Sequence, residues 1–228
     1  MASRMRGFLL PLAWLGCAFA AQAQVARLPD VAGGTYSVPV VSLKQGRVAG
    51  TVLQQYDFSC GSAAIATLLT HHYGHSVTEQ AVLQEMYATG DQPKIQKEGF
   101  SLLDMKRYLA GLGYTADGFQ QPLDKLIESR IPAVVLVNEN GYHHFVVVKG
   151  LDAQRVLIGD PAKGTRALSR KEFESIWQNG LLFVIHNRME LARFNQPADW
   201  RGVPRASLLA SRDGLAGVGL AKHGPGDF

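Results

Sequence analysis

Cysteine is scarce in this sequence, whose 228 residues include only Cys17 and Cys60. Cys17 falls in a segment where a short apolar run leads to Ala21-Gln22-Ala23, which has the small side chains of a secretory cleavage site. Without residues 1–23, Cys60 would have no disulfide partner in a compartment where paired thiols oxidise. The scarcity therefore excludes a disulfide framework and leaves Cys60 as a nucleophile or as an inert, buried thiol.

Long hydrophobic runs are also absent. The apolar run at residues 8–20 is too short to span a bilayer, and no later run replaces it. We therefore interpret residues 1–23 as a signal peptide cleaved near Ala23, and we expect a periplasmic chain without a transmembrane segment. A second interpretation makes Leu15-Gly16-Cys17 a lipobox, so that Cys17 would become the acylated first residue of a lipoprotein.

The sequence lacks a strong excess of charge of either sign. It has 23 basic and 19 acidic residues, and losing Arg4 and Arg6 with the signal peptide would leave 21 basic residues and a net charge of about +2. A nucleic-acid partner would require a concentrated basic surface. The composition therefore gives no reason to expect one.

Periodicity divides the remaining chain into three parts. Residues 24–45 lack a sustained pattern, and we assign them to an N-terminal extension. Residues 46–188 carry the apolar patterns of one folded domain. Residues 189–228 contain scattered prolines and a glycine-rich end, and we expect this C-terminal tail to be partly disordered.

The first half of the domain has helical patterns. The apolar residues of 61–73 predict a buried helix that begins next to Cys60. Ser76-Val77-Thr78-Glu79 has the form of a capping box and predicts a second helix through Met86. Ser101 predicts the start of a third helix. Pro122 predicts a short fourth helix over 123–128.

The second half has β-branched runs. Residues 133–137, 144–148 and 156–158 predict a meander whose first two strands are joined by a turn at 138–141. Ser169 to Glu172 forms another capping box, which predicts a helix as far as Trp177, and residues 181–185 predict a last strand. Helices followed by an antiparallel sheet indicate an α+β domain, with N-terminal helices packed on a C-terminal sheet.

This order of elements offers the groups needed for acyl transfer. A thiol at a helix N-terminus, such as Cys60, faces backbone N–H groups and the positive end of the helix dipole, which favour thiolate. His144, on a strand, could exchange a proton with that thiol. Asp160, after the next strand, could orient the imidazole. The amide of Gln54 and the backbone N–H of Cys60 could form an oxyanion hole.

Each assignment has an alternative. Gln55 could replace Gln54 and is disfavoured only by its spacing to Cys60. His143 competes with His144, and strand alternation sends their side chains to opposite faces. We prefer His144 because it directly precedes the apolar run. Asp160 stands before a proline, so it could simply begin a turn.

A metal site is not expected. His71 and His75 are four residues apart, as zinc ligands on a helix are, and His72 lies between them. No carboxylate or thiol accompanies them at a recognised spacing, and Gly74 interrupts the helix. Cys60, His144 and Asp160 could also ligate zinc, but a thiol at a helix start beside an oxyanion donor fits catalysis better. We therefore expect neither a metal nor a cofactor.

The same residues, in this order, resemble the peptidase C39 family of papain-like cysteine proteases over about residues 52–185. The matching motifs are Gln54, Cys60-Gly61 at the head of an Ala-rich helix, His144-Phe145-Val146-Val147-Val148, and Asp160-Pro161-Ala162-Lys163-Gly164. The resemblance implies a papain-like fold in which Gln54 is the oxyanion residue, Cys60 the nucleophile, His144 the general base and Asp160 the orienting residue. Phe173, Trp177, Gly180 and Leu181 resemble the family's closing helix and strand.

The resemblance also implies a function. Well-known members of the family are cytosolic domains of bacteriocin exporters, which remove leader peptides after a double glycine. This chain looks more like a stand-alone periplasmic member that serves functional-amyloid secretion. The implied activity is a cysteine peptidase acting on a protein or peptide, and the implied partners are amyloid subunits or their outer-membrane export component. Two alternatives are acyl transfer to an amine or thiol, and a catalytically silent peptide-binding or chaperone module.

Overall fold

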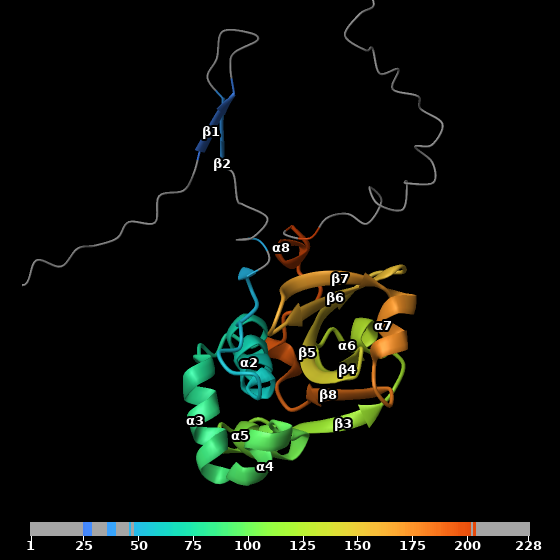
Figure 1. The fold of residues 1–228 in the computed structure, drawn as a ribbon. Coiled ribbons are helices and arrows are strands. Elements are labelled where there is room, and N and C mark those ends of the chain that lie inside the picture. The colour runs from blue at the N-terminus through green and yellow to red at the C-terminus, as the bar shows by residue number, and fades with distance from the viewer. Residues whose placement is uncertain (1–24, 29–35, 40–45, 47, 202, 204–228) are drawn as a thin grey trace, which may run out of the picture. The chain divides into compact units, whose positions relative to one another are not determined.

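The computed structural model describes residues 25–28, 36–39, 46, 48–201 and 203 (Figure 1). The chain forms two units, residues 1–41 and residues 42–228. The first contains two antiparallel strands, β1 (Val25–Leu28) and β2 (Tyr36–Pro39). The predicted signal peptide and residues 204–228 of the predicted tail lie outside the described residues.

The predicted helix after Cys60 is confirmed, but it has two parts. Regular helix α2 (Cys60–Thr67) passes into the wider π-helical turn η1 (Leu68–His72). Every residue of α2 is buried, because its side chains are mostly small and allow neighbouring elements to approach closely. Cys60 is the first residue of α2, as the sequence predicts.

Three more helices complete this half of the domain: α3 (Glu79–Thr89), α4 (Gln92–Glu98) and α5 (Leu102–Gly111). Ser101 caps α5 in a capping box, as predicted. The predicted cap at Ser76 is wrong, since Thr78 caps α3 by accepting a hydrogen bond from the N–H of Ala81. Glu79 instead turns inward, where Oε1 lies 3.2 Å from Ser62 Oγ of α2.

The second half forms one six-stranded antiparallel sheet with strand order β3-β8-β4-β5-β6-β7. Its strands are β3 (Ala116–Gln120), β4 (Ala133–Glu139), β5 (Tyr142–Leu151), β6 (Arg155–Asp160), β7 (Gly164–Ser169) and β8 (Leu181–Ile185). Helices α6 (Asp124–Ser129) and α7 (Arg170–Ile176) interrupt it in sequence. The α+β class and the N-terminal grouping of helices are therefore confirmed.

The turn between β4 and β5 is tighter than predicted. Asn140 and Gly141 have φ values of 54° and 85°, and a two-residue hairpin turn of type I′ needs positive φ at both positions. Both strands consequently reach further than expected, and the β4–β5 ladder pairs Glu139 with Tyr142.

Strand β5 separates two hydrophobic cores. Phe145 and Val147 point into the core formed with α2, α3 and α5, whereas Val146 and Val148 point into the core formed with α6 and α7. Figure 1 shows these two groups of helices on opposite sides of the sheet. Burial on both faces explains why β5 is a continuous hydrophobic run.

The chain beyond Arg188, which we assigned to the tail, continues along the domain as η2 (Met189–Leu191) and α8 (Pro197–Trp200). Phe194 is buried in the second core. The N–H of Asn195 donates to the carbonyl of Lys149 at 2.8 Å. This carbonyl is available because a β-bulge removes Lys149 from the β5–β6 ladder.

A buried ion pair secures this segment. Lys149 is 0% exposed, and its Nζ lies 2.9 Å from Asp199 Oδ1 and 2.7 Å from the carbonyl oxygen of Gly50. Burial lowers the pKa of Lys149, while the carboxylate of Asp199 raises it.

Among the described helices, none is long and apolar enough to cross a membrane.

This pair yields a stability prediction. Asp199→Asn leaves a buried ammonium without a counter-charge, and we expect it to lower the free energy of unfolding by about 3 to 5 kcal/mol at pH 7. The loss should shrink at alkaline pH, because the unfolded chain keeps the Lys149 proton longer than the folded variant does. Urea denaturation at pH 7 and pH 9.5 measures both effects.

The matched control is Asp124→Asn. Asp124 pairs with Arg170, but its side chain is 59% exposed, so its replacement should cost about 1 kcal/mol or less. Equal losses for the two variants would contradict a special contribution from the buried pair.

Candidate active site

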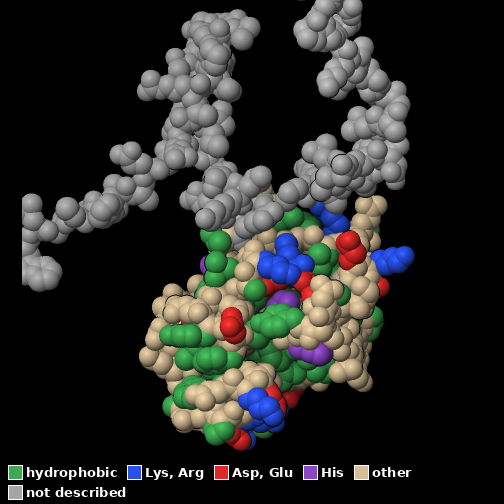
Figure 2. All heavy atoms as spheres, in the orientation of Figure 1, with side chains coloured by type: hydrophobic (Ala, Val, Ile, Leu, Met, Phe, Trp, Pro, Cys, Tyr) green, Lys and Arg blue, Asp and Glu red, His purple; other side chains and the backbone are tan. Residues whose placement is uncertain are grey.

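The predicted site residues lie at one end of the contact between α2 and the sheet. Helix α2 packs on β5 and β6. Cys60 begins α2, His144 lies near the start of β5, and Asp160 ends β6. Figure 2 shows hydrophobic side chains gathered on the face where helices and sheet meet, with histidine side chains between them.

His144 is the histidine that lies against Asp160. Its side chain is 1% exposed, and Nε2 lies 3.4 Å from Oδ2 of Asp160. The other ring nitrogen, Nδ1, is buried and has no hydrogen-bond partner in the described part of the chain. His143 points away, is exposed, and lies with Nε2 3.1 Å from Nδ2 of Asn138. The ring of His144 thus has one nitrogen at a carboxylate and one available for a proton.

Asp160 is a buried, ionised carboxylate. Its Oδ1 accepts hydrogen bonds from the N–H groups of Ala162 at 2.9 Å and Lys163 at 3.2 Å, and its Oδ2 accepts one from Arg166 Nε at 3.0 Å. Burial raises its pKa, but the bonds and charges of His144, Ala162 and Arg166 outweigh burial and lower it to about 2. Asp160 therefore begins the turn after β6, and its Oδ2 also lies 3.4 Å from Nε2 of His144.

Cys60 is a buried thiol. It is 7% exposed, and burial raises its pKa above the ordinary value, although the N–H groups of Phe145, Gly61 and Cys60 itself lower it. The negative charge of Asp160 raises it further. Our expectation that the helix terminus would favour thiolate is thus opposed by desolvation, which is the larger effect. A neutral thiol needs a nearby base before it can act as a nucleophile.

Gln54 lies beside the turn that follows Asp160. Its backbone N–H donates to the carbonyl of Pro161 at 3.0 Å, and its side-chain Nε2 donates to the carbonyl of Tyr56 at 3.0 Å. Its Oε1 is buried and has no hydrogen-bond partner in the described part of the chain. Gln55 is exposed. Of the two glutamines, Gln54 is therefore the one fixed against the elements that carry the site.

Tyr142 is a site residue that sequence reasoning missed. Its ring stacks on His144 with centroids 5.2 Å apart, and its hydroxyl donates to the carbonyl of Asp57 at 3.4 Å. It thereby bridges the start of β5 and the loop that precedes Cys60. Burial raises its pKa, and the charge of Cys60 adds to the increase. Strand alternation from His144 would have found it if β5 had been predicted to begin at residue 142.

Arg166 and Glu139 were also missed. Arg166 donates to Asp160 and contacts Glu139 of β4 through Nη2. Because Asp160 pairs with Gly164 across the β6–β7 hairpin, Arg166 is the diagonal neighbour of Asp160 on the same face. The sequence feature that could have identified Arg166 is its spacing of six residues from Asp160 across a tight hairpin. This spacing places the two side chains together only if residues 164–169 are known to form a strand.

Two histidines of the predicted cluster, His72 and His75, have structural partners. His72 Nδ1 lies 2.6 Å from the carbonyl oxygen of Arg193, and burial lowers its pKa to about 4, so this ring is neutral. His75 Nδ1 lies 3.4 Å from the hydroxyl of Tyr114. Within residues 48–201, no group of three or more His, Cys, Asp and Glu side chains is arranged to hold a metal ion.

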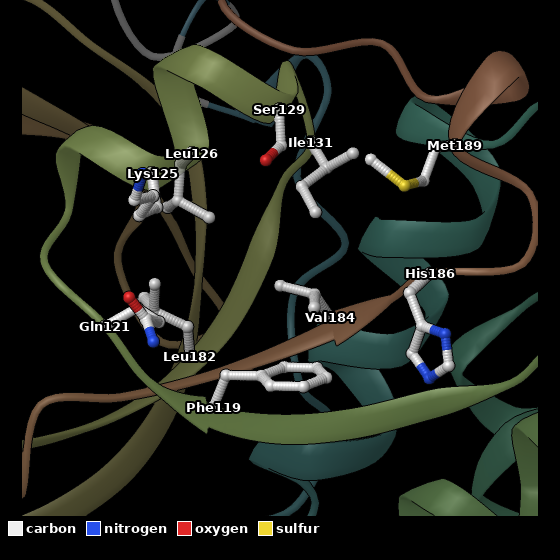
Figure 3. A pocket seen from close by; sticks show the side chains of 10 residues that line it. All are labelled: Phe119, Gln121, Lys125, Leu126, Ser129, Ile131, Leu182, Val184, His186 and Met189. Carbon is white, nitrogen blue, oxygen red and sulfur yellow. The ribbon is translucent and has the colours of Figure 1, made fainter.

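An apolar cavity of about 250 Å³ lies elsewhere, between β3, β8 and α6 (Figure 3). Phe119, Leu182, Val184 and Ile131 line it together with the sulfur-bearing side chain of Met189. None of the predicted site residues borders it. It contributes nothing to the chemistry of the thiol site.

Comparison with known proteins relates this geometry to a family. The model of the peptidase C39 family matches residues 49–189. The chain is 41% identical over 170 residues to the "Probable functional amyloid protease FapD" of Pseudomonas fluorescens, covering 75% of this chain and 74% of that protein. Its identity to the protein of the same name from Pseudomonas aeruginosa is 42% over 153 residues, covering 67% of each.

A solved structure with a similar fold is the peptidase domain of Streptococcus ComA, described as a bifunctional ABC transporter involved in quorum sensing. The identity is 23% and the TM-score 0.49, and the match covers 59% of this chain and 96% of that domain.

Because the family model matches more than half of the sequence, and a relative shares 41% identity over three quarters of it, the chain belongs to the peptidase C39 family.

Proposed function

We propose that this protein is a cysteine peptidase in which Cys60 is the nucleophile, His144 the general base and acid, Asp160 the orienting carboxylate and Gln54 an oxyanion donor. The observation that carries the proposal is the state of the buried His144 ring. One nitrogen faces an ionised carboxylate, and the other is unpartnered at the end of the sheet against which Cys60 begins its helix. His72 also has a buried nitrogen without a hydrogen-bond partner among the described residues, but its other nitrogen lies against the carbonyl oxygen of Arg193, so the ionised carboxylate distinguishes His144.

The proposed reaction uses these groups in two stages. The Sγ proton of Cys60 moves to Nδ1 of His144, and the sulfur attacks the carbonyl carbon of the scissile peptide bond. His144 then gives the proton to the leaving amine as the C–N bond breaks, which leaves a thioester on Cys60. Water, deprotonated by His144, attacks that thioester and releases the acid and the thiol.

Two features support the developing negative charges. The N–H groups of Cys60, Gly61 and Phe145 act on the Cys60 sulfur and favour its anion. The side chain of Gln54 and the N–H of Cys60, which has no acceptor within its own helix, would receive the oxyanion. The ionised Asp160 would stabilise His144 when it carries the proton.

The proposed substrate is a protein of a functional-amyloid export pathway, acted on in the periplasm after removal of residues 1–23. Two relatives more than 40% identical over two thirds of this chain or more carry the name "Probable functional amyloid protease FapD". The proposed partners are therefore amyloid subunits or their outer-membrane export component.

A second function has a specific observation in its favour. Burial raises the pKa of Cys60, and one proton of the Gln54 amide is already donated to Tyr56. Both features fit a catalytically silent member of the family that holds a peptide or acts as a chaperone. Cleavage assays and alkylation distinguish the two functions.

The direct test incubates the purified chain with a candidate amyloid subunit and identifies the products by mass spectrometry. We expect cleavage by the wild type and none by Cys60→Ala, since the thioester cannot form. Adding hydroxylamine should convert part of the new C-terminus to a hydroxamate if a thioester accumulates. Binding without cleavage by both proteins would favour the peptide-binding function.

The state of the thiol can be measured without a known substrate. Because burial raises the pKa of Cys60, labelling by iodoacetamide below pH 8 requires that His144 accepts the proton. We expect the wild type to label at pH 6 to 7 and His144→Ala to label only at alkaline pH. His143→Ala is the matched control and should follow the wild type. A single alkaline profile for all three proteins would argue against a reactive thiol–imidazole pair.

The oxyanion role is tested by neighbouring glutamines. Gln54→Ala should lower kcat by about 10² to 10³-fold, the usual effect of losing one oxyanion donor. Gln55→Ala, which alters an exposed side chain, should leave kcat unchanged. If both variants keep the wild-type kcat, Gln54 is not an oxyanion donor.

A further inference from the structure

Arg166 joins three strands at the rear of the proposed site. Its Nε lies 3.0 Å and its Nη2 2.9 Å from the same Oδ2 atom of Asp160. The guanidinium also contacts Glu139 of β4, which in turn contacts Lys163 in the turn before β7. Arg166 is 22% exposed, so it connects the solvent edge of the sheet with a carboxylate that is 0% exposed.

The distances show that Oδ2 of Asp160 is shared between the imidazole of His144 and the guanidinium of Arg166. Oδ2 lies 3.4 Å from His144 Nε2 but closer to both nitrogens of Arg166. Oδ1 is occupied by the N–H groups of Ala162 and Lys163. The carboxylate therefore has no freedom to rotate, and Arg166 fixes the oxygen that His144 reaches.

Other arginine pairs in the domain lack this feature. Arg155 pairs with Asp152, and Arg170 pairs with Asp124, yet those carboxylates are 40% and 59% exposed. Exposed pairs are weakened by water and salt. In the pair of Arg166 and Asp160 the carboxylate is 0% exposed. A buried charge is screened least by water, so it has a larger electrostatic effect on a neighbouring group than an exposed charge has.

We propose that Arg166 is a positioning residue of the thiol site, which holds Asp160 in place for His144 and, by its own charge, limits how strongly Asp160 stabilises the imidazolium. This inference rests on the proposed function, because it assigns Asp160 and His144 to that reaction. The ion-pair partners of Arg166 among the described residues are Asp160 and Glu139, so any effect on the thiol passes through Asp160.

The charged and titratable groups around His144 determine the expected sign. Cys60 faces the site from α2, Tyr142 stacks on the ring from β5, and Asp160 reaches it from β6. Arg166 of β7 acts through Asp160. Removing the positive charge of Arg166 leaves the full negative charge of Asp160 to His144, so the imidazolium becomes more stable.

Glu139, on β4, gives the opposite sign. Its carboxylate pairs with both Arg166 and Lys163, so it balances part of the positive charge of Arg166. Removing the negative charge of Glu139 leaves Arg166 to act on Asp160 alone, so the imidazolium becomes less stable. A residue with a merely structural role would not produce shifts of opposite sign in these two variants.

The experiment titrates His144 by NMR in the full chain carrying Cys60→Ala, so that the imidazole is not coupled to the thiol. Arg166→Met should raise the titration midpoint of His144 by roughly one pH unit, the size expected for a nearby charge at an effective dielectric constant of about 20. Arg166→Lys, which keeps the charge, should shift it less. Glu139→Gln should lower it.

Arg170→Met is the matched control, since Arg170 is 23% exposed and also pairs with an aspartate. It should leave the midpoint unchanged. If Arg166→Met does not fold, the downward shift in Glu139→Gln carries the test. Equal midpoints in Arg166→Met, Glu139→Gln and Arg170→Met would overturn the inference.

Kinetics provide a second readout. With Cys60 present, Arg166→Met should lower kcat by about 10 to 100-fold through misplacement of the imidazole, while KM stays unchanged because Arg166 does not contact substrate. If the wild type neither cleaves nor labels, the proposed function fails whatever Arg166 does. If the wild type is active and Arg166→Met matches Arg170→Met in both midpoint and kcat, only the inference fails.

Discussion

The geometry of the thiol site depends on one buried charge, the carboxylate of Asp160. Two backbone N–H groups, one guanidinium and one imidazole surround it, and they keep it ionised although no water reaches it. In the turn that follows Asp160, the carbonyl of Pro161 accepts a hydrogen bond from the backbone N–H of Gln54. This bond connects the loop that leads to Cys60 with the turn that holds Asp160. Loss of this charge would therefore disturb both sides of the site together.

The domain surrounding that charge is organised by β5. Its alternate side chains fill two separate cores. Helix α2, which begins with Cys60, packs on one side of the strand and helices α6 and α7 pack on the other, so both groups are held against the strand that carries His144. At Lys149, whose carbonyl accepts a hydrogen bond from Asn195, a bulge interrupts the ladder between β5 and β6. The strand is thus both the centre of the hydrophobic structure and the support of the proposed base, which couples the stability of the fold to the geometry of the site.

Much of this arrangement could be predicted from residues that stand beside strong local signals. Cys60 opens an apolar helix, His144 precedes a β-branched run, and the caps at Ser101 and Ser169 are formed as expected. The edge strands β3 and β7 were missed because their residues are partly polar and lack alternation. Tyr142 was missed because β5 was predicted to begin two residues too late. Arg166 could not be found because its role depends on the register between β6 and β7, which a single sequence does not specify. The cap at Ser76 was misplaced because Glu79 finds a partner in α2, a tertiary contact that local patterns do not contain.

The buried pair of Lys149 and Asp199 also affects how the chain matures. A polypeptide is synthesised from its N-terminus, so Lys149 emerges 50 positions ahead of the only carboxylate that pairs with it in the described structure. Until Asp199 arrives, the centre of the sheet must either keep that ammonium in water or release its proton. Strand β5, which carries both Lys149 and His144, therefore gains its full stability only after Asp199 has been synthesised, so a residue far outside the thiol site contributes to the support of His144.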